Sequence, residues 1–144
     1  DQWFRDNIAQ DFPEIRTQIS GLLQIEAELQ EIVQLVGSDA LPVDQQLTLE
    51  VARMIREFFL QQNGFDPVDA YCDIKLQYEM AKAILSFQDA AKTAMADGAL
   101  LNDVVNVPAR SNLMRGRFED GYLERIEAMV KEMNEQIANA VEAN

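Results

Sequence analysis

Carboxylates are the abundant reactive side chains of this sequence, and four glutamates could act together. Glu26, Glu28, Glu31 and Glu50 could in principle supply an acid–base pair or the oxygen ligands of a metal ion. However, charged residues on amphipathic helices usually face water, and the di-metal pattern of helical bundles requires Glu-x-x-His. We therefore expect these four side chains to be solvated, and we expect no metal site.

The missing residue types exclude several classes of enzyme. The sequence contains no histidine, which removes the commonest general base and every Ser-His or Cys-His nucleophile pair. It also contains neither Gly-Lys-Ser/Thr nor Gly-x-Gly-x-x-Gly, so no loop of a known type is available to hold phosphates. We therefore expect no catalytic residue within these 144 residues.

The net charge restricts the partners of the chain. There are 25 acidic residues against 12 basic ones, a formal charge of -13. This balance argues against nucleic acid and anionic membrane surfaces, which bind clustered lysine and arginine. The one basic cluster contains Arg110, Arg115 and Arg117. It could keep a linker soluble or contact an acidic partner, and both interpretations stay open.

The sequence also bears on location. A single cysteine, Cys72, cannot form an internal disulfide, so nothing indicates an oxidising compartment. No apolar run approaches the ~18 residues that span a bilayer, and the first residues, "DQWFRDN", lack the features of a signal peptide. We expect a cytoplasmic protein without direct membrane insertion.

Helical periodicity covers the first half of the chain. Apolar residues recur at steps of three and four and predict one buried stripe on a helix over 13–36, namely Ile15, Ile19, Leu22, Ile25, Leu29, Ile32 and Val36. Asp11 and Gly37 suit the two ends of this helix. After the break "GSDALPVDQQ", Asp44 is the candidate N-cap of a second helix that reaches about Gln62.

Helices are expected in the second half as well. A third helix is predicted over 74–96, with Asp73 as its cap and Gly98 as its stop. Its second apolar stripe, Met80, Ile84 and Phe87, indicates burial on two sides. A less regular connection over 99–118 precedes a last helix over about 119–141. The fold class is all-α, an irregular helical bundle of about four main helices in one domain, 1–144.

Four segments carry a resemblance to a known family: "WFRDNIAQDFPEI", "LLQIEAELQEIVQLVGSDALP", "LTLEVARMIREFFLQQNGFDPVDAYC" and "KLQYEMAKAIL". They resemble the C-terminal helical domain of the catalytic A subunit, or alpha chain, of V/A-type rotary ATPases. The likeness is nearly continuous from Trp3 to about Leu85 and only general from Phe87 onward. It implies a longer subunit, in which residues 1–12 link this domain to a nucleotide-binding core.

The resemblance also implies two sites. The first is the contact with the rotating central shaft, which a more distant likeness to the F-type β subunit places on Asp39, Ala40, Leu41, Pro42, Val43 and Asp44. This contact would depend more on Leu41, Pro42 and Val43 than on charge. The second is the adenine pocket, where Phe65 would pack on the base, with Gln62, Asn63 and Gly64 beside it. Without the resemblance, Phe65 would be interpreted as an apolar contact that follows a glycine-terminated helix.

Cofactors and partners follow from the same resemblance. ATP or ADP with Mg²⁺ would bind in the parent subunit, and no cofactor is expected in the isolated domain. The partners would be the neighbouring non-catalytic B subunits of a hexameric ring and the rotor subunit of the central stalk. The complex would couple ATP synthesis or hydrolysis to proton or sodium transport, with this subunit forming a peripheral part on the cytoplasmic side. The alternative is a stand-alone acidic helical adaptor that binds partner helices and is unrelated to ATP.

Overall fold

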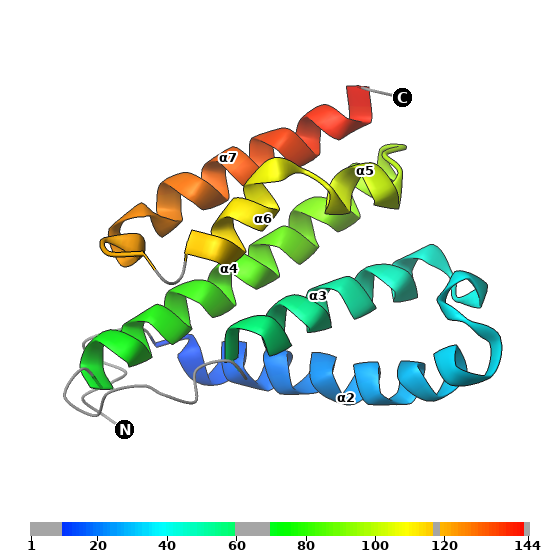
Figure 1. Ribbon diagram of the computed structural model, residues 1–144, viewed down its shortest axis with the longest axis horizontal. Coiled ribbons are helices and arrows are strands. Elements are labelled where there is room, and N and C mark those ends of the chain that lie inside the picture. Colours follow the sequence, from blue (N-terminus) through cyan, green and yellow to red (C-terminus); the bar gives the residue numbers. More distant parts are fainter. Residues whose placement is uncertain (1–9, 60–69, 117–118, 143–144) are drawn as a thin grey trace.

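A computed structural model describes residues 10–59, 70–116 and 119–142, with side chains from residue 74 onward in the second range. Every regular element in these ranges is helical, which confirms the predicted all-α class (Figure 1). The elements are α2 (Phe12–Val36), the 3-10 turn η1 (Ser38–Ala40), α3 (Val43–Phe59), α4 (Ala70–Ala96), α5 (Leu101–Val105), α6 (Pro108–Arg115) and α7 (Tyr122–Glu142).

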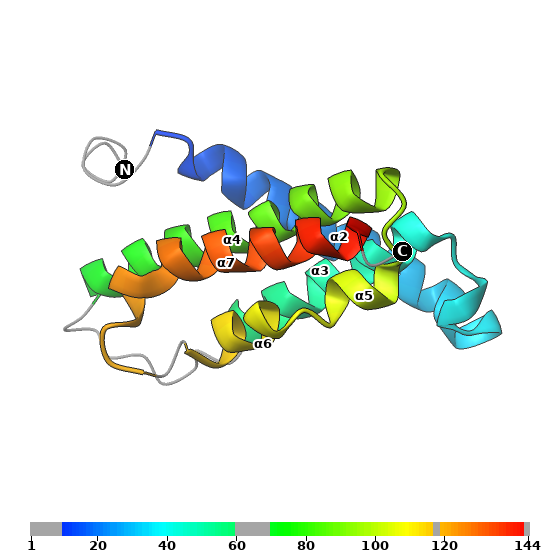
Figure 2. The ribbon, with the colours of Figure 1, turned by 90° about the horizontal axis from the view of Figure 1, so that it is seen from above.

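Helix α4 lies at the centre of the bundle. It packs against α3 on one side and α7 on the other, while α2 pairs with α3 and the short helices α5 and α6 contact α7 (Figures 1 and 2). Met80, Ile84 and Phe87 of α4 are fully buried in the shared core, so the predicted second stripe is confirmed. None of the helices in the described ranges is long and apolar enough to cross a membrane.

Two predicted helix caps are wrong. Helix α4 begins at Ala70, so Asp73 lies inside its first turn and does not precede it. Helix α3 begins at Val43, and Asp44 is likewise a first-turn residue. The acidic side chain of Asp44 is favourable there, because the N-terminal end of a helix carries partial positive charge. The predicted stop at Gly98 is confirmed by its φ of +108°.

The predicted apolar stripe of α2 is only partly buried. Ile15, Ile19, Leu22 and Leu29 are in the core, but Ile25 is 46% exposed, Ile32 44% and Val36 61%. Glu26 takes the inward position instead. Successive residues lie about 100° apart around a helix, so turning Glu26 toward α3 brings Ile25 to the surface.

The connection over 99–118 contributes to the core, although both of its helices are short. Val104 of α5 and Leu113 of α6 are fully buried. The Tyr122 hydroxyl at the start of α7 donates a hydrogen bond to the Leu113 carbonyl, which ties α7 to α6. This part of the chain therefore packs as closely as the long helices do.

Candidate functional site

The end of the α2–α3 hairpin projects beyond the other helices in both views (Figures 1 and 2). Gly37 ends α2 with a φ of +87°, and its N–H donates to the Val33 carbonyl at 2.8 Å. The turn η1 follows, and the Leu41 N–H closes it by donating to the Ser38 carbonyl at 3.1 Å. The chain therefore reverses direction in a short, hydrogen-bonded turn at the tip.

The six residues predicted for the shaft contact all lie at this tip. Five are exposed: Asp39, Ala40, Pro42, Val43 and Asp44. Leu41 is different, because it is only 5% exposed and its carbonyl accepts a hydrogen bond from the Gln46 side chain at 2.9 Å. Leu41 therefore anchors the turn from inside, and its side chain is not available at the surface.

Apolar surface at the tip comes mainly from residues beside the predicted six. Leu35 is 85% exposed, Val36 61% and Val43 50%. Together with Ile25 and Ile32, they make up five of the six large hydrophobic residues that are exposed in the described ranges. The sequence prediction missed Leu35. Its one signal was that a large apolar residue lies on this helix outside the predicted buried stripe.

The hairpin is acidic as well as apolar. Residues 17–52 contain six acidic residues and no lysine or arginine. Glu26 pairs with Arg56 of α3, and Glu50 pairs with Arg53 of α3 and with Arg110 of α6. The other four are exposed: Glu28, Glu31, Asp39 and Asp44. An apolar patch with acidic surroundings fits a partner that is both apolar and basic.

The expected solvation of the glutamates is wrong for Glu26. This residue is 6% exposed, and its carboxylate pairs with the Arg56 guanidinium of α3 at 2.5 Å. A carboxylate tolerates such burial when an opposite charge with hydrogen-bond donors compensates for the lost water. The pair joins α2 to α3 and has a structural role. In the described ranges no group of three acidic, cysteine or histidine residues could hold a metal ion.

Arg110 of the basic cluster lies in the core and not at the surface. It is 7% exposed, pairs with the Glu50 carboxylate at 3.0 Å and donates to the Val105 carbonyl at 3.0 Å. Its guanidinium carbon lies 4.9 Å from the centre of the Phe87 ring. Burial lowers the pKa of Arg110, while the charge of Glu50 raises it. Arginine stays charged within any such shift, so Arg110 is a buried cation that links α6 to α3 and α4.

The remaining members of the basic cluster differ from Arg110. Arg115 is exposed and donates to the Asn112 side chain at 2.8 Å. Arg117 lies outside the described residues. Of the two described members, Arg110 therefore lies in the core, and Arg115 at the surface is accessible to an acidic partner.

The predicted adenine-side residues Gln62, Asn63, Gly64 and Phe65 lie outside the described residues. The helix ends on either side of them are described. At the end of α3, Phe58 is fully buried, and the Phe59 ring meets it edge-on at a centroid distance of 4.9 Å. The end of α3 and the start of α4 lie at the opposite end of the bundle from the hairpin tip (Figure 1).

The start of α2 is fixed to α4. The Tyr78 hydroxyl donates to the Asp11 carboxylate at 3.0 Å, and the Phe12 ring packs on the Tyr78 ring at 5.3 Å. Burial raises the pKa of Tyr78, and the hydrogen bond to Asp11 raises it further. The neutral hydroxyl is therefore favoured as the donor. Asp11 and the first residue of α2 are therefore held against α4.

Comparison with known proteins identifies the family. The profile of the family described as the C-terminal domain of V and A type ATP synthase matches residues 1–105. The chain belongs to this family. The match covers the hairpin, its tip and all of α4, and it agrees with the resemblance seen in the sequence.

Relatives extend the likeness of this ATP synthase C-terminal domain beyond residue 105. The chain is 45% identical over 137 residues to the A-type ATP synthase A subunit of Methanosarcina barkeri, covering 95% of the chain and 24% of that relative. It is 44% identical over 142 residues to an A-type ATP synthase A subunit of Methanospirillum hungatei JF-1, covering 99% and 24%. It is 47% identical over 137 residues to the corresponding protein of Natronomonas pharaonis, covering 95% and 23%. The chain thus spans about a quarter of the length of these relatives.

Proposed function

We propose that this domain transmits force between nucleotide chemistry and a rotating central shaft in a V/A-type ATP synthase. The exposed apolar tip of the acidic hairpin carries this proposal, since it supplies a surface suited to an apolar and basic shaft. The contact would use Leu35, Val36 and Val43, with Asp39, Ala40, Pro42 and Asp44 around them. Leu41 would hold the turn in shape.

The adenine side of the proposal rests on family membership. Phe65, with Gln62, Asn63 and Gly64, would line the adenine pocket of the parent subunit, where ATP or ADP binds with Mg²⁺. Helix α3 joins this end to the tip, and its 17 residues span about 25 Å. Movement driven by nucleotide binding would thus reach the shaft through one continuous helix, and neighbouring B subunits would complete the ring. The family match favours this function over a stand-alone adaptor.

The tip can be tested with one charge in the complete subunit within its complex. Leu35→Lys should weaken the shaft contact by roughly 10- to 100-fold, because it loses apolar burial and sets a positive charge against a basic partner. The number of ions moved per ATP hydrolysed, measured in reconstituted vesicles, should fall. Leu100→Lys is the matched control, since Leu100 is 58% exposed and lies outside the hairpin. Equal coupling in both variants would contradict the proposal.

The adenine pocket has a separate test in the same complete subunit. Phe65→Ala should weaken ATP binding by about 1–3 kcal/mol, the typical contribution of base stacking on an aromatic ring. Phe65→Tyr keeps a flat ring and should retain most of the affinity. Nucleotide titration calorimetry would measure both variants. Unchanged affinity in Phe65→Ala would return Phe65 to a purely structural contact.

A further inference from the structure

A long groove runs between α4 and α7, and neither α2 nor α3 contributes to its lining. It consists of two adjoining hollows of about 540 and 410 Å³, which share Ser86. On one side the lining extends from Glu79 of α4 to Asp97, the residue after the end of this helix, a length of about 27 Å at 1.5 Å per residue. This length accommodates a helix of about five turns.

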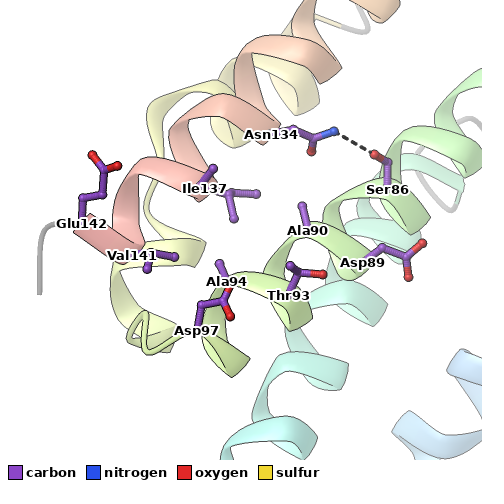
Figure 3. A pocket seen from close by; sticks show the side chains of 11 residues that line it. Ser86, Asp89, Ala90, Thr93, Ala94, Asp97, Asn134, Ile137, Val141 and Glu142 are labelled. Carbon is purple, nitrogen blue, oxygen red and sulfur yellow. Dashed lines mark hydrogen bonds between the residues drawn. The ribbon is translucent and has the colours of Figure 1, made fainter.

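The floor of the wider hollow is apolar and combines small side chains on α4 with larger ones on α7. Ala90 and Ala94 of α4 face Ile137 and Val141 of α7 across the wider hollow (Figure 3). Alanine side chains allow another helix to approach closely, and they leave room for larger side chains from a partner. The groove is therefore shaped to receive bulky apolar residues.

The rim of the groove carries strong negative charge. Five carboxylates line the two hollows against one ammonium, which gives a net charge of -4: Glu79, Asp89, Asp97, Glu127 and Glu142 against Lys82. The Lys82 ammonium lies 4.8 Å from the centre of the Tyr78 ring, near one end of the groove. The wider hollow thus has acidic residues and no basic residue among those that line it.

A polar group without a partner lies where the two hollows meet. The Asn134 side chain donates to the Ser86 hydroxyl at 3.1 Å (Figure 3). Its Oδ1 atom is buried and has no hydrogen-bond partner among the described residues. Buried acceptors of this kind are rare in folded proteins. If the Asn134 side-chain amide turned toward the groove, a donor on a bound molecule would supply the hydrogen bond that its Oδ1 atom lacks.

We propose that this groove is a docking site for a basic amphipathic helix from another polypeptide. Apolar side chains of that helix would enter the alanine-lined floor, and its lysines or arginines would pair with Asp89, Asp97 and Glu142. Charge decides the kind of partner: a second copy of this chain carries a net charge of -13 and would be repelled. The site is separate from the hairpin tip, so the shaft contact can fail while this site stands.

The test uses the complete subunit in its assembled complex, with a photo-crosslinking amino acid at Thr93. This residue is exposed and lines the wider hollow. The matched control places the same amino acid at Ala128, which is exposed on α7 and lines neither hollow. We expect Thr93 to crosslink to a segment of another polypeptide with lysine or arginine and apolar residues at helical spacing. Ala128 should give little of this product.

Charge reversal at the rim tests whether the crosslink depends on the acidic residues of the groove or only on a polypeptide that happens to lie nearby. Asp89→Lys combined with Asp97→Lys should lower the crosslink yield from Thr93 by ~10-fold or more, because attraction becomes repulsion. Glu124→Lys combined with Glu135→Lys, at exposed positions outside the groove, should leave the yield unchanged. If the reversed protein fails to assemble, Asp89→Asn with Asp97→Asn replaces it and should give a smaller loss.

Four results would overturn the proposal. These are crosslinks only within the same polypeptide, crosslinks to a second copy of it, crosslinks to a segment without basic residues, and equal yields from Thr93 and Ala128. A yield that withstands loss of both rim charges would overturn it as well.

Discussion

Arg110 is a charged residue that lies in the core of this molecule and not at its surface. The guanidinium is buried among Glu50, Phe87 and two main-chain carbonyls, of Val105 and of Glu50 itself. Burying it removes one of only 12 basic residues from the surface of an already acidic chain. Glu26 is buried as well, so the two buried charges cancel, and the surface keeps the acidic balance of the composition, which favours basic partners.

Loss of the Arg110 side chain should be costly. We expect Arg110→Ala to lower the free energy of unfolding by about 2 kcal/mol, because two carbonyls lose their buried donor and the Glu50 carboxylate keeps only the exposed Arg53 as a partner. Urea denaturation followed by circular dichroism would measure the change. Arg115→Ala is the control, since Arg115 is exposed and should change stability by about 0.5 kcal/mol or less. Similar losses in both variants would show that the buried network contributes little.

Substitutions at two glycines test the local conformation of α2. Gly21 lies inside α2, and a Cβ atom there would meet nothing within 4 Å. Gly21→Ala should therefore stabilise the protein by about 0.5–1 kcal/mol through the better helix propensity of alanine. Gly37 ends α2 at a φ of +87°, so Gly37→Ala should destabilise by about 1–2 kcal/mol. Thermal melts of the two variants should move in opposite directions, and a shift in the same direction would contradict this account.

The positions of the helices were more predictable from the sequence than the side-chain contacts between them. Periodicity located the long helices and the buried stripe of α4, because burial on a helix must repeat at 3.6 residues per turn. It could not reveal that Glu26 faces α3, since that depends on Arg56, which lies 30 residues further along the chain. It likewise assigned Ile25 to the core. The burial of Arg110 left no periodic signal, because its partners come from three other helices.

The position of the hairpin tip was predictable from the sequence, but which of its residues are exposed was not. The break between two helical patterns predicted a connection over 37–46, and the family resemblance assigned residues 39–44 within it; the structure has the turn η1 and the start of α3 there. Which of them face solvent depends on how the turn folds back, and this buries Leu41 and exposes Val43. Leu35 was missed because a single apolar residue on a solvent-facing position has no distinctive pattern.

At the scale of the whole molecule, one core connects every α-helix in the described ranges. It runs from Phe12 of α2 through Phe58 of α3 and Phe87 of α4 to Ile137 of α7. Close-packed interiors have low compressibility, so a displacement at one end of such a bundle reaches the other end with little loss. This property is what the proposed transmission between the adenine side and the hairpin tip requires.

Ile84 offers a test of that continuity. It is fully buried at the centre of α4, and Ile84→Val should lower the free energy of unfolding by about 1 kcal/mol. If the bundle unfolds as one cooperative unit, the amides of α2 and α3 should lose as much protection as those of α7. Native-state hydrogen exchange, compared between the original chain and the variant, would measure both. Equal losses of protection fit a body that moves rigidly. A loss of protection confined to α4 and α7 would mean that the hairpin opens independently. Force applied at its tip would then be absorbed before it reached the nucleotide.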